Sequence, residues 1–177
     1  MQRTYKIMRR FFYAIIPLLL LSGCATRVQT GPVLGSIADL ESVWETDKGE
    51  RIAFRKFQGE KLVLSVFYVS CKTVCPMVIR SLKDMESDVK FRNEKFLLVD
   101  IDSKDGVREL RDFKKREGLS DRWILVRGSE SDVRELSSLL EINYRSNGGE
   151  IEHSVGKFEI SRSGEIRRIL DSGKLPE

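Results

Sequence analysis

Residues 62–76 read LVLSVFYVSCKTVCP, and this stretch decides the fold. Its first seven residues are almost all apolar or β-branched, which is typical of a strand covered on both faces of a sheet. Cys71 and Cys75 follow directly, and Pro76 suits the first turn of a helix, because its missing N–H would have no partner there. We therefore expect a buried strand, a cysteine loop and a helix, in that order.

The chain on both sides of this stretch alternates between strand and helix patterns. After Pro76, apolar residues recur at helical steps, and the later pattern predicts strands at 96–101 and 123–126 and helices at 107–117 and 132–142. Two hairpins are predicted, an N-terminal one over 42–54 and a C-terminal one made of strands 157–161 and 166–170. This order predicts the α/β class: a thioredoxin-like fold with a mixed central sheet and helices on both faces.

The N-terminal segment has the plan of an export signal. Four basic residues precede an apolar run at 11–21, which Pro17 interrupts. A membrane-spanning helix needs about 20 apolar residues, roughly twice this length, so a signal is favoured over a permanent span. Residues 21–24, LSGC, resemble a bacterial lipobox in which Cys24 takes the lipid; an ordinary signal with an incidental cysteine is the alternative.

These features predict the domain organisation and the location. We expect a lipoprotein signal peptide over 1–23, a lipidated Cys24 with a flexible tether over 24–38, and one thioredoxin-like domain over 39–177. Such a protein is exported, anchored to a bacterial membrane by its lipid, and faces the periplasm or the cell exterior.

The basic excess of the chain lies in the predicted signal. The sequence has 31 basic and 27 acidic residues, and removing the four basic residues before Cys24 leaves 27 of each sign. A formally neutral domain lacks the positive charge that nucleic-acid binding requires, so we expect no nucleic-acid partner.

Cys71 and Cys75 are predicted to lie where a strand ends and a helix begins. Ligands of α/β sheets bind at this edge, and the positive end of a helix stabilises a thiolate. The i, i+4 spacing puts both sulfurs on one helical face, close enough to share a metal ion at about 2.3 Å. The same spacing allows a disulfide, the default for two cysteines in an exported domain, so metal and disulfide chemistry both stay open.

His153 is the only histidine, and it lies just before a predicted late strand. In a thioredoxin-like sheet this junction approaches the cysteine loop. Two thiolates and an imidazole suit copper, as Cu+ or Cu2+, and can also bind zinc. We therefore predict a copper site made of Cys71, Cys75 and His153, although a lone histidine is more often a surface or packing residue.

The motifs GEKLVLSVFY at 59–68, CKTVCP at 71–76, VDIDSKD at 99–105 and the late Glu152-His153-Ser154 resemble the core of the Sco/SenC family in order and approximate spacing. The resemblance covers roughly residues 42–170. It implies a thioredoxin fold that binds one copper ion through the two cysteines and the histidine. It also implies a role in assembling the copper-A centre of cytochrome c oxidase, with that subunit or another cuproprotein as partner. The chain departs from the family in Glu152, where aspartate is usual, and in residues 103–106, where a Pro-rich acidic loop is usual.

Two functions follow from these residues. The first is a metallochaperone, which is not an enzyme; the second is an exported thiol-disulfide oxidoreductase that uses Cys71 and Cys75 as its dithiol. Thioredoxins place a cis-proline opposite the cysteines, and this chain has no proline between Pro76 and Pro176, which favours metal binding.

Four further residues near the predicted site carry possible donor atoms. We expect Met77 and Met85 to belong to the core rather than to bind copper. Asp100 and Asp102 either tune the site or are solvated loop carboxylates.

Overall fold

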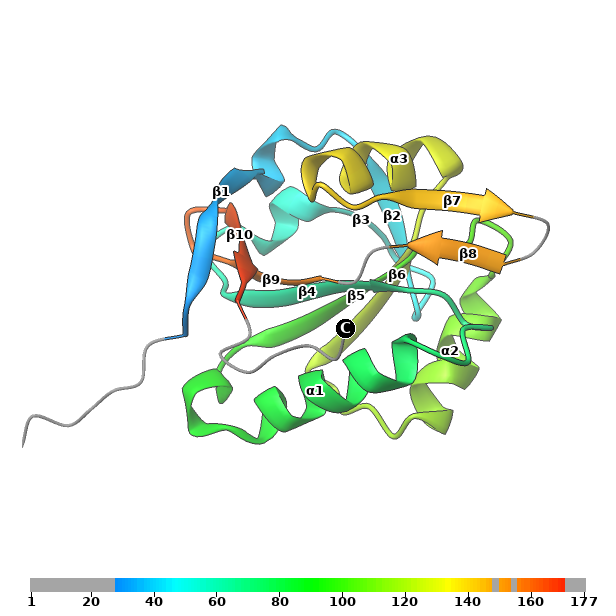
Figure 1. Cartoon of the computed structure of the whole chain (residues 1–177), viewed down its shortest axis with the longest axis horizontal. Coiled ribbons are helices and arrows are strands. Elements are labelled where there is room, and N and C mark those ends of the chain that lie inside the picture. The colour runs from blue at the N-terminus through cyan, green and yellow to red at the C-terminus, as the bar shows by residue number, and fades with distance from the viewer. Residues whose placement is uncertain (1–27, 148–149, 154–155, 171–177) are drawn as a thin grey trace, which may run out of the picture.

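The computed structural model describes residues 28–147, 150–153 and 156–170, with the backbone alone for 144–147 and 150–153. Its main feature is one mixed sheet with the strand order β1-β10-β9-β4-β5-β6-β2-β3 (Figure 1). The strands are β1 (Thr30–Ser36), β2 (Val43–Thr46), β3 (Arg51–Ala53), β4 (Leu62–Phe67), β5 (Lys95–Asp100), β6 (Trp123–Arg127), β9 (Lys157–Ile160) and β10 (Glu165–Ile169). A separate hairpin consists of β7 (Tyr144–Asn147) and β8 (Glu150–His153).

The centre of the sheet is parallel, and its flanks are antiparallel. Strand β5 pairs in parallel with both β4 and β6, whereas β9 and β2 pair antiparallel with β4 and β6. The β2–β3 pair and the β9–β10 pair are the N-terminal and C-terminal hairpins that the turn residues predict. The mixed sheet and both hairpins are therefore confirmed.

Helices cover both faces of the sheet, as the sequence predicts. Helices α1 (Cys75–Ser87) and α2 (Val107–Arg116) lie on one face, and α3 (Glu130–Leu139) lies on the other (Figure 1). Short 3-10 turns link the elements: η1 (Ile37–Asp39), η2 (Phe54–Phe57) and η3 (Val89–Phe91).

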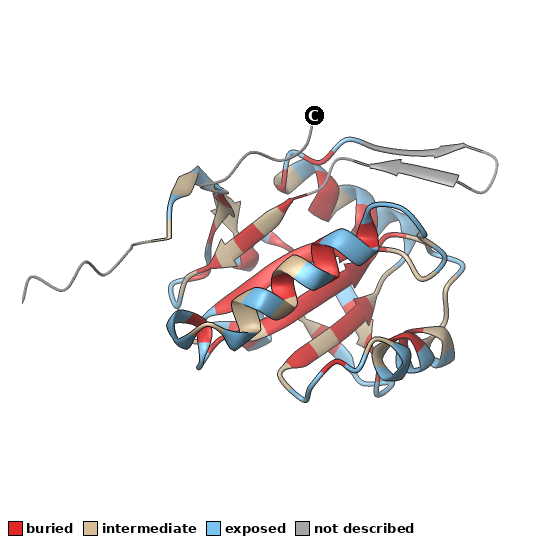
Figure 2. Ribbon diagram, turned by 60° about the horizontal axis from the view of Figure 1, so that its bottom comes forward, coloured by how far each residue is buried: buried red, intermediate tan, exposed pale blue. Residues whose placement is uncertain are grey.

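Strand β4 explains why the sequence has a nearly continuous apolar run. All six of its residues are buried; Figure 2 shows the buried strands of the central sheet. Leu64 and Val66 pack on the side of α3, whereas Val63 and Phe67 pack on the side of α1 and α2. A strand that lies between two helical layers has no solvent face, so it has no polar alternation.

Helix starts follow local capping chemistry. Pro76 lies in the first turn of α1, and the Glu109 carboxylate accepts the Gly106 N–H at 3.1 Å to cap α2. At α3, Ser129 and Asp132 cap each other's backbone N–H groups and so form a capping box.

The tether prediction is wrong for residues 30–38. Thr30–Ser36 forms β1 at the edge of the sheet, paired with β10 through a register with two irregularities, and Ile37 is buried. Pro32 and the neighbouring glycines suggested a chain without structure, but an edge strand tolerates them, because only one side of its backbone pairs.

The sequence did not predict the β7–β8 hairpin. The predicted signal peptide 1–23 and Cys24 lie outside the described residues, and no helix among the described ones is long and apolar enough to cross a bilayer.

Candidate metal centre

The two predicted cysteines lie together at the junction between β4 and α1. Both are free thiols; Cys71 is half-buried in the loop, and Cys75 begins the helix and is buried. The Cys75 N–H donates a hydrogen bond to Cys71 Sγ at 3.3 Å, and the Cys71 N–H donates to the Tyr68 carbonyl at 3.2 Å. The predicted position of the pair, at the carboxyl end of a buried strand and the N-terminus of a helix, is therefore confirmed.

The two thiols differ in acidity. Burial on its own would raise the pKa of Cys71. Hydrogen bonds to its sulfur outweigh this effect, and the pKa is lowered. They come from the side chain and N–H of Cys75, the Thr73 backbone and the Tyr68 side chain. Burial raises the pKa of Cys75 to about 12, and the neighbouring Cys71 sulfur adds to this. Cys71 is consequently the thiol that loses its proton first, and it becomes the more reactive sulfur.

A buried carboxyl group lies behind the cysteine loop. Asp100 ends β5 in register with Phe67, the last residue of β4, and is only 1% exposed. Its Oδ1 accepts the Asp102 N–H at 2.9 Å, whereas no described residue donates to its Oδ2. Burial raises the pKa of Asp100 to about 9, and the nearby carboxyl of Asp105 raises it further. Asp100 therefore holds a proton at neutral pH and is not a solvated loop carboxylate.

Asp105 connects this carboxyl pair to the cysteine loop. Its Oδ2 accepts the Val69 N–H at 3.0 Å, and its carbonyl accepts the Arg127 Nε–H at 2.6 Å. Burial and the nearby Asp105 carboxyl both disfavour the charged form of Asp100, so the deeper Asp100 is the group that carries the proton. The backbone just before Cys71 is thus fixed from beneath. Asp105 ends the 99–105 motif, but the sequence pattern assigns it no role at the site, because its only local signal is its place after the β5 strand.

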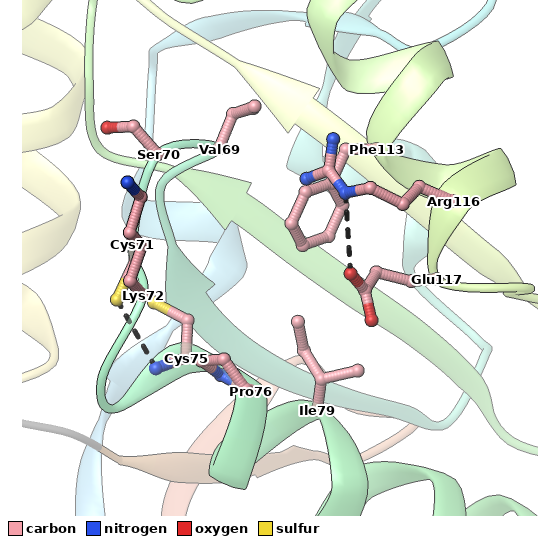
Figure 3. Close-up of a pocket in the computed structure, with 10 residues that line it drawn as sticks. All are labelled: Val69, Ser70, Cys71, Lys72, Cys75, Pro76, Ile79, Phe113, Arg116 and Glu117. Carbon is pink, nitrogen blue, oxygen red and sulfur yellow. Dashed lines mark hydrogen bonds and ion pairs between the residues drawn. The ribbon is translucent and has the colours of Figure 1, made fainter.

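A cavity of about 450 Å³ opens beside the two sulfurs (Figure 3). One wall is the cysteine loop and the start of α1, including Pro76 and Ile79. The other wall is the end of α2, with Phe113, Arg116 and Glu117. Nothing in the sequence indicated these α2 residues, because their place in the site depends on how two helices pack.

The two methionines near the site have different environments. Met85 is half-buried and packs against the core below α1, as predicted. Met77 is 58% exposed, so its predicted place in the core is wrong: it follows Pro76 on the outer side of the first helical turn.

His153 is the last residue of β8, where its backbone is paired opposite Tyr144. Its side chain lies outside the described part of the structure. Among the side chains that are described, no group of three or more His, Cys, Asp or Glu is close enough to hold a metal ion. The predicted third ligand therefore stays a prediction.

Gly156 and Lys157 lie beside β4 and α1. Ser65 of β4 donates to the Gly156 carbonyl at 2.7 Å, and Lys157 donates to Ser81 of α1 at 2.8 Å. Because β9 runs antiparallel to β4, the chain before Lys157 extends toward the end of β4 that leads into Cys71. His153 lies four positions before Lys157 in the sequence, a reach of at most about 14 Å.

Comparisons with solved structures support the fold. A SCO1/SenC family lipoprotein from Bacillus anthracis matches with 20% identity and a TM-score of 0.67, covering 78% of this chain and 86% of that chain. Copper-bound yeast Sco1 matches with 14% identity and a TM-score of 0.65 (80% and 81% covered). BsSco, described as a member of the Sco family of cytochrome c oxidase assembly proteins with a disulfide switch, matches with 19% identity and a TM-score of 0.65 (78% and 85% covered).

A comparison with curated protein sequences finds no match. The model of the SCO1/SenC family, by contrast, matches residues 43–177, which include both cysteines and the histidine. Since this match covers well over half of the sequence, the chain belongs to the SCO1/SenC family.

Proposed function

We propose that this protein is a copper metallochaperone that binds one copper ion through Cys71, Cys75 and His153 and delivers it to a cuproprotein. The observation that carries the proposal is the pair of free thiols within one turn, with the Cys75 N–H on Cys71 Sγ at 3.3 Å. Family membership supports it, as do the copper-bound structures of yeast Sco1 and of ScoI from Arabidopsis thaliana. The expected client is the copper-A subunit of cytochrome c oxidase, the assembly role named for the family of BsSco.

The donor set fits a soft metal ion. Two sulfurs four positions apart, one in the loop and one at the start of α1, favour copper, most strongly Cu+, and an imidazole completes a site with few ligands. Both cysteines line the cavity, but Cys75 is only 2% exposed, whereas Cys71 is partly accessible. A ligand that faces an open cavity can be exchanged for the thiol of a client without unfolding the site. Bound copper would supply only its affinity for sulfur, so no bond in a substrate has to be broken.

Residues around the thiols prepare the site for binding. The hydrogen bond from the Val69 N–H to Asp105 fixes the cysteine loop, and the hydrogen bonds to the Cys71 sulfur favour its thiolate. The proton on Cys75 has to leave when a metal binds, so copper uptake is coupled to proton release.

Copper titration of the reduced protein tests the proposal. We expect the wild type to bind one equivalent of Cu+ in competition with a chromophoric chelator. The variants Cys71→Ser, Cys75→Ser and His153→Ala should each lose tight binding, whereas Met77→Leu, an exposed thioether in the same turn, should retain it. Undiminished affinity in His153→Ala would remove the histidine from the ligand set.

A second candidate function is that of an exported thiol-disulfide oxidoreductase. It is favoured by the unequal acidity of the thiols, because Cys71 would attack a disulfide and Cys75 would resolve the mixed disulfide. Reduction of a model disulfide substrate separates the functions. Efficient turnover by wild type and by His153→Ala, together with weak copper binding, would favour the oxidoreductase.

We further propose that the protein is exported and lipid-anchored through Cys24, facing the periplasm or the cell exterior. The lipobox-like residues 21–24 support this, and the matched B. anthracis protein is itself a lipoprotein. Labelled palmitate should be incorporated into the wild type in bacterial cells and not into Cys24→Ser. Equal labelling of both proteins would contradict lipidation at Cys24.

A further inference from the structure

We propose that the cavity between α1 and α2 is the docking pocket for the client's cysteine-bearing segment, and that it accepts an apolar side chain next to an acidic residue. This inference rests on the proposed function, because it names what the delivered copper passes to. It concerns residues of α2 that bind no metal in the proposed site.

The floor of the cavity is apolar and lies next to the reactive sulfur. Ile79 and Phe113 are each 3% exposed and line the cavity together with Cys71 (Figure 3). With a volume of about 450 Å³, the cavity can accommodate a large aliphatic or aromatic side chain. A client residue inserted here would bring the neighbouring part of its chain to the Cys71 side of the site.

The rim of the cavity carries more positive than negative charge. Lys72 lies on the cysteine wall, and Arg116 lies on the α2 wall with its guanidinium over the Phe113 ring, 5.0 Å from the centroid. Glu117 is the carboxylate of the lining, and its Oε1 lies 3.6 Å from Arg116 Nε (Figure 3). This ion pair involves the Nε of Arg116, and the Arg116 side chain is still 54% exposed. The excess positive charge complements an acidic group on the incoming segment.

The α2 wall is held in place before any client arrives. Lys83 of α1 donates to the Glu117 carbonyl, which joins the ends of the two helices. Lys114 donates to the Trp123 carbonyl at 2.5 Å and pairs with Asp47 at 3.2 Å. A preformed pocket loses little conformational freedom on binding, which favours its use in recognition.

Exposed apolar side chains extend the surface beyond the cavity. Val74 and Met77 flank Cys75 and are 38% and 58% exposed, whereas the helix buries Val78, Ile79 and Leu82. Apolar groups that remain exposed around reactive thiols are typical of a protein contact surface. The client would therefore cover this turn while its acidic residue reaches Arg116.

Transfer of copper to a model client tests the pocket. The probe is a short synthetic peptide in which two cysteines flank a leucine and an aspartate, and a second peptide carries lysine in place of the aspartate. We expect Arg116→Glu to slow Cu+ transfer to the aspartate peptide about tenfold at low salt and to speed transfer to the lysine peptide. The matched control is Arg108→Glu on the same helix, whose side chain is 83% exposed and does not line the cavity.

Two further measurements keep this proposal separate from the proposed function. Copper content is measured first in every variant, and a wild type that holds no copper overturns the chaperone function. Fluorescence anisotropy with peptides whose cysteines are replaced by serine then tests docking on the metal-free protein. Binding that Arg116→Glu and Arg108→Glu change equally, or that does not distinguish the two peptides, would overturn the docking pocket.

Discussion

Replacing Asp100 by asparagine should stabilise the protein, and by more as the pH rises. Asp100 is 1% exposed, and its pKa of about 9 in the folded state lies far above the ordinary value of 3.8. Between these two pH values the folded state holds a proton that the unfolded state releases. Stability is therefore lost as pH rises from about 4 to about 9, by at most about 1.4 kcal/mol per pH unit.

The substitution keeps the contacts and removes the titration. The asparagine carbonyl can accept the Asp102 N–H as Oδ1 of Asp100 does, and the amide is neutral beside the Asp105 carboxyl, as the protonated Asp100 is. At pH 7 the proton linkage amounts to about 4 kcal/mol, an upper bound for the gain in the free energy of unfolding. We expect a gain of roughly 2 to 4 kcal/mol, since the amide does not reproduce every contact.

Urea denaturation under reducing conditions at pH 5, 6, 7 and 8 measures this difference. The gain of Asp100→Asn over the wild type should grow with each pH step, whereas Asp112→Asn, an exposed carboxylate on α2, should show little change at any pH. A gain that is constant from pH 5 to 8, or a variant less stable than the wild type at pH 8, would refute a protonated Asp100.

Three further outcomes follow from the same structure. Asp47→Ala should lower the free energy of unfolding by about 2 to 4 kcal/mol in urea, because it leaves Lys114, 14% exposed, without its carboxylate; a loss no greater than that of Asp112→Ala would contradict this. Iodoacetamide at pH 7 should modify Cys71 at least about tenfold faster than Cys75, since Cys75 is 2% exposed and has a pKa of about 12. Peptide mass spectrometry measures the two rates, and equal rates would contradict this difference. The apparent Cu+ affinity in chelator competition should rise with pH from 6 to 8, by about one to two decades per pH unit, because both thiols release protons on binding; an affinity independent of pH would exclude thiolate ligands.

The strand, the cysteine loop and the helix at residues 62–87 were predictable because their signals are local. A nearly continuous apolar run, a proline in the first turn and apolar steps of three and four each follow from the geometry of one element. The same holds for the capping box at Ser129 and for the turns of the two hairpins.

Features that depend on contacts between distant parts of the sequence were either not predicted or predicted wrongly. Strand β1 exists because β10 offers an unpaired edge, and nothing local in its Gly- and Pro-containing sequence indicates this. Asp100 is buried because Asp105 and the end of β4 cover it, whereas an aspartate at a strand end is usually solvated. The approach of Arg116 to the thiols is set by the packing of α2 beside α1.

X-ray absorption at the copper edge of the Cu+-loaded protein shows which atoms bind the metal. We expect a first shell of two sulfur atoms at about 2.2–2.3 Å and one nitrogen atom, with the nitrogen lost in His153→Ala and one sulfur lost in Cys71→Ser or Cys75→Ser. A shell without nitrogen in the wild type, or one that the cysteine variants leave unchanged, would contradict copper binding by Cys71, Cys75 and His153.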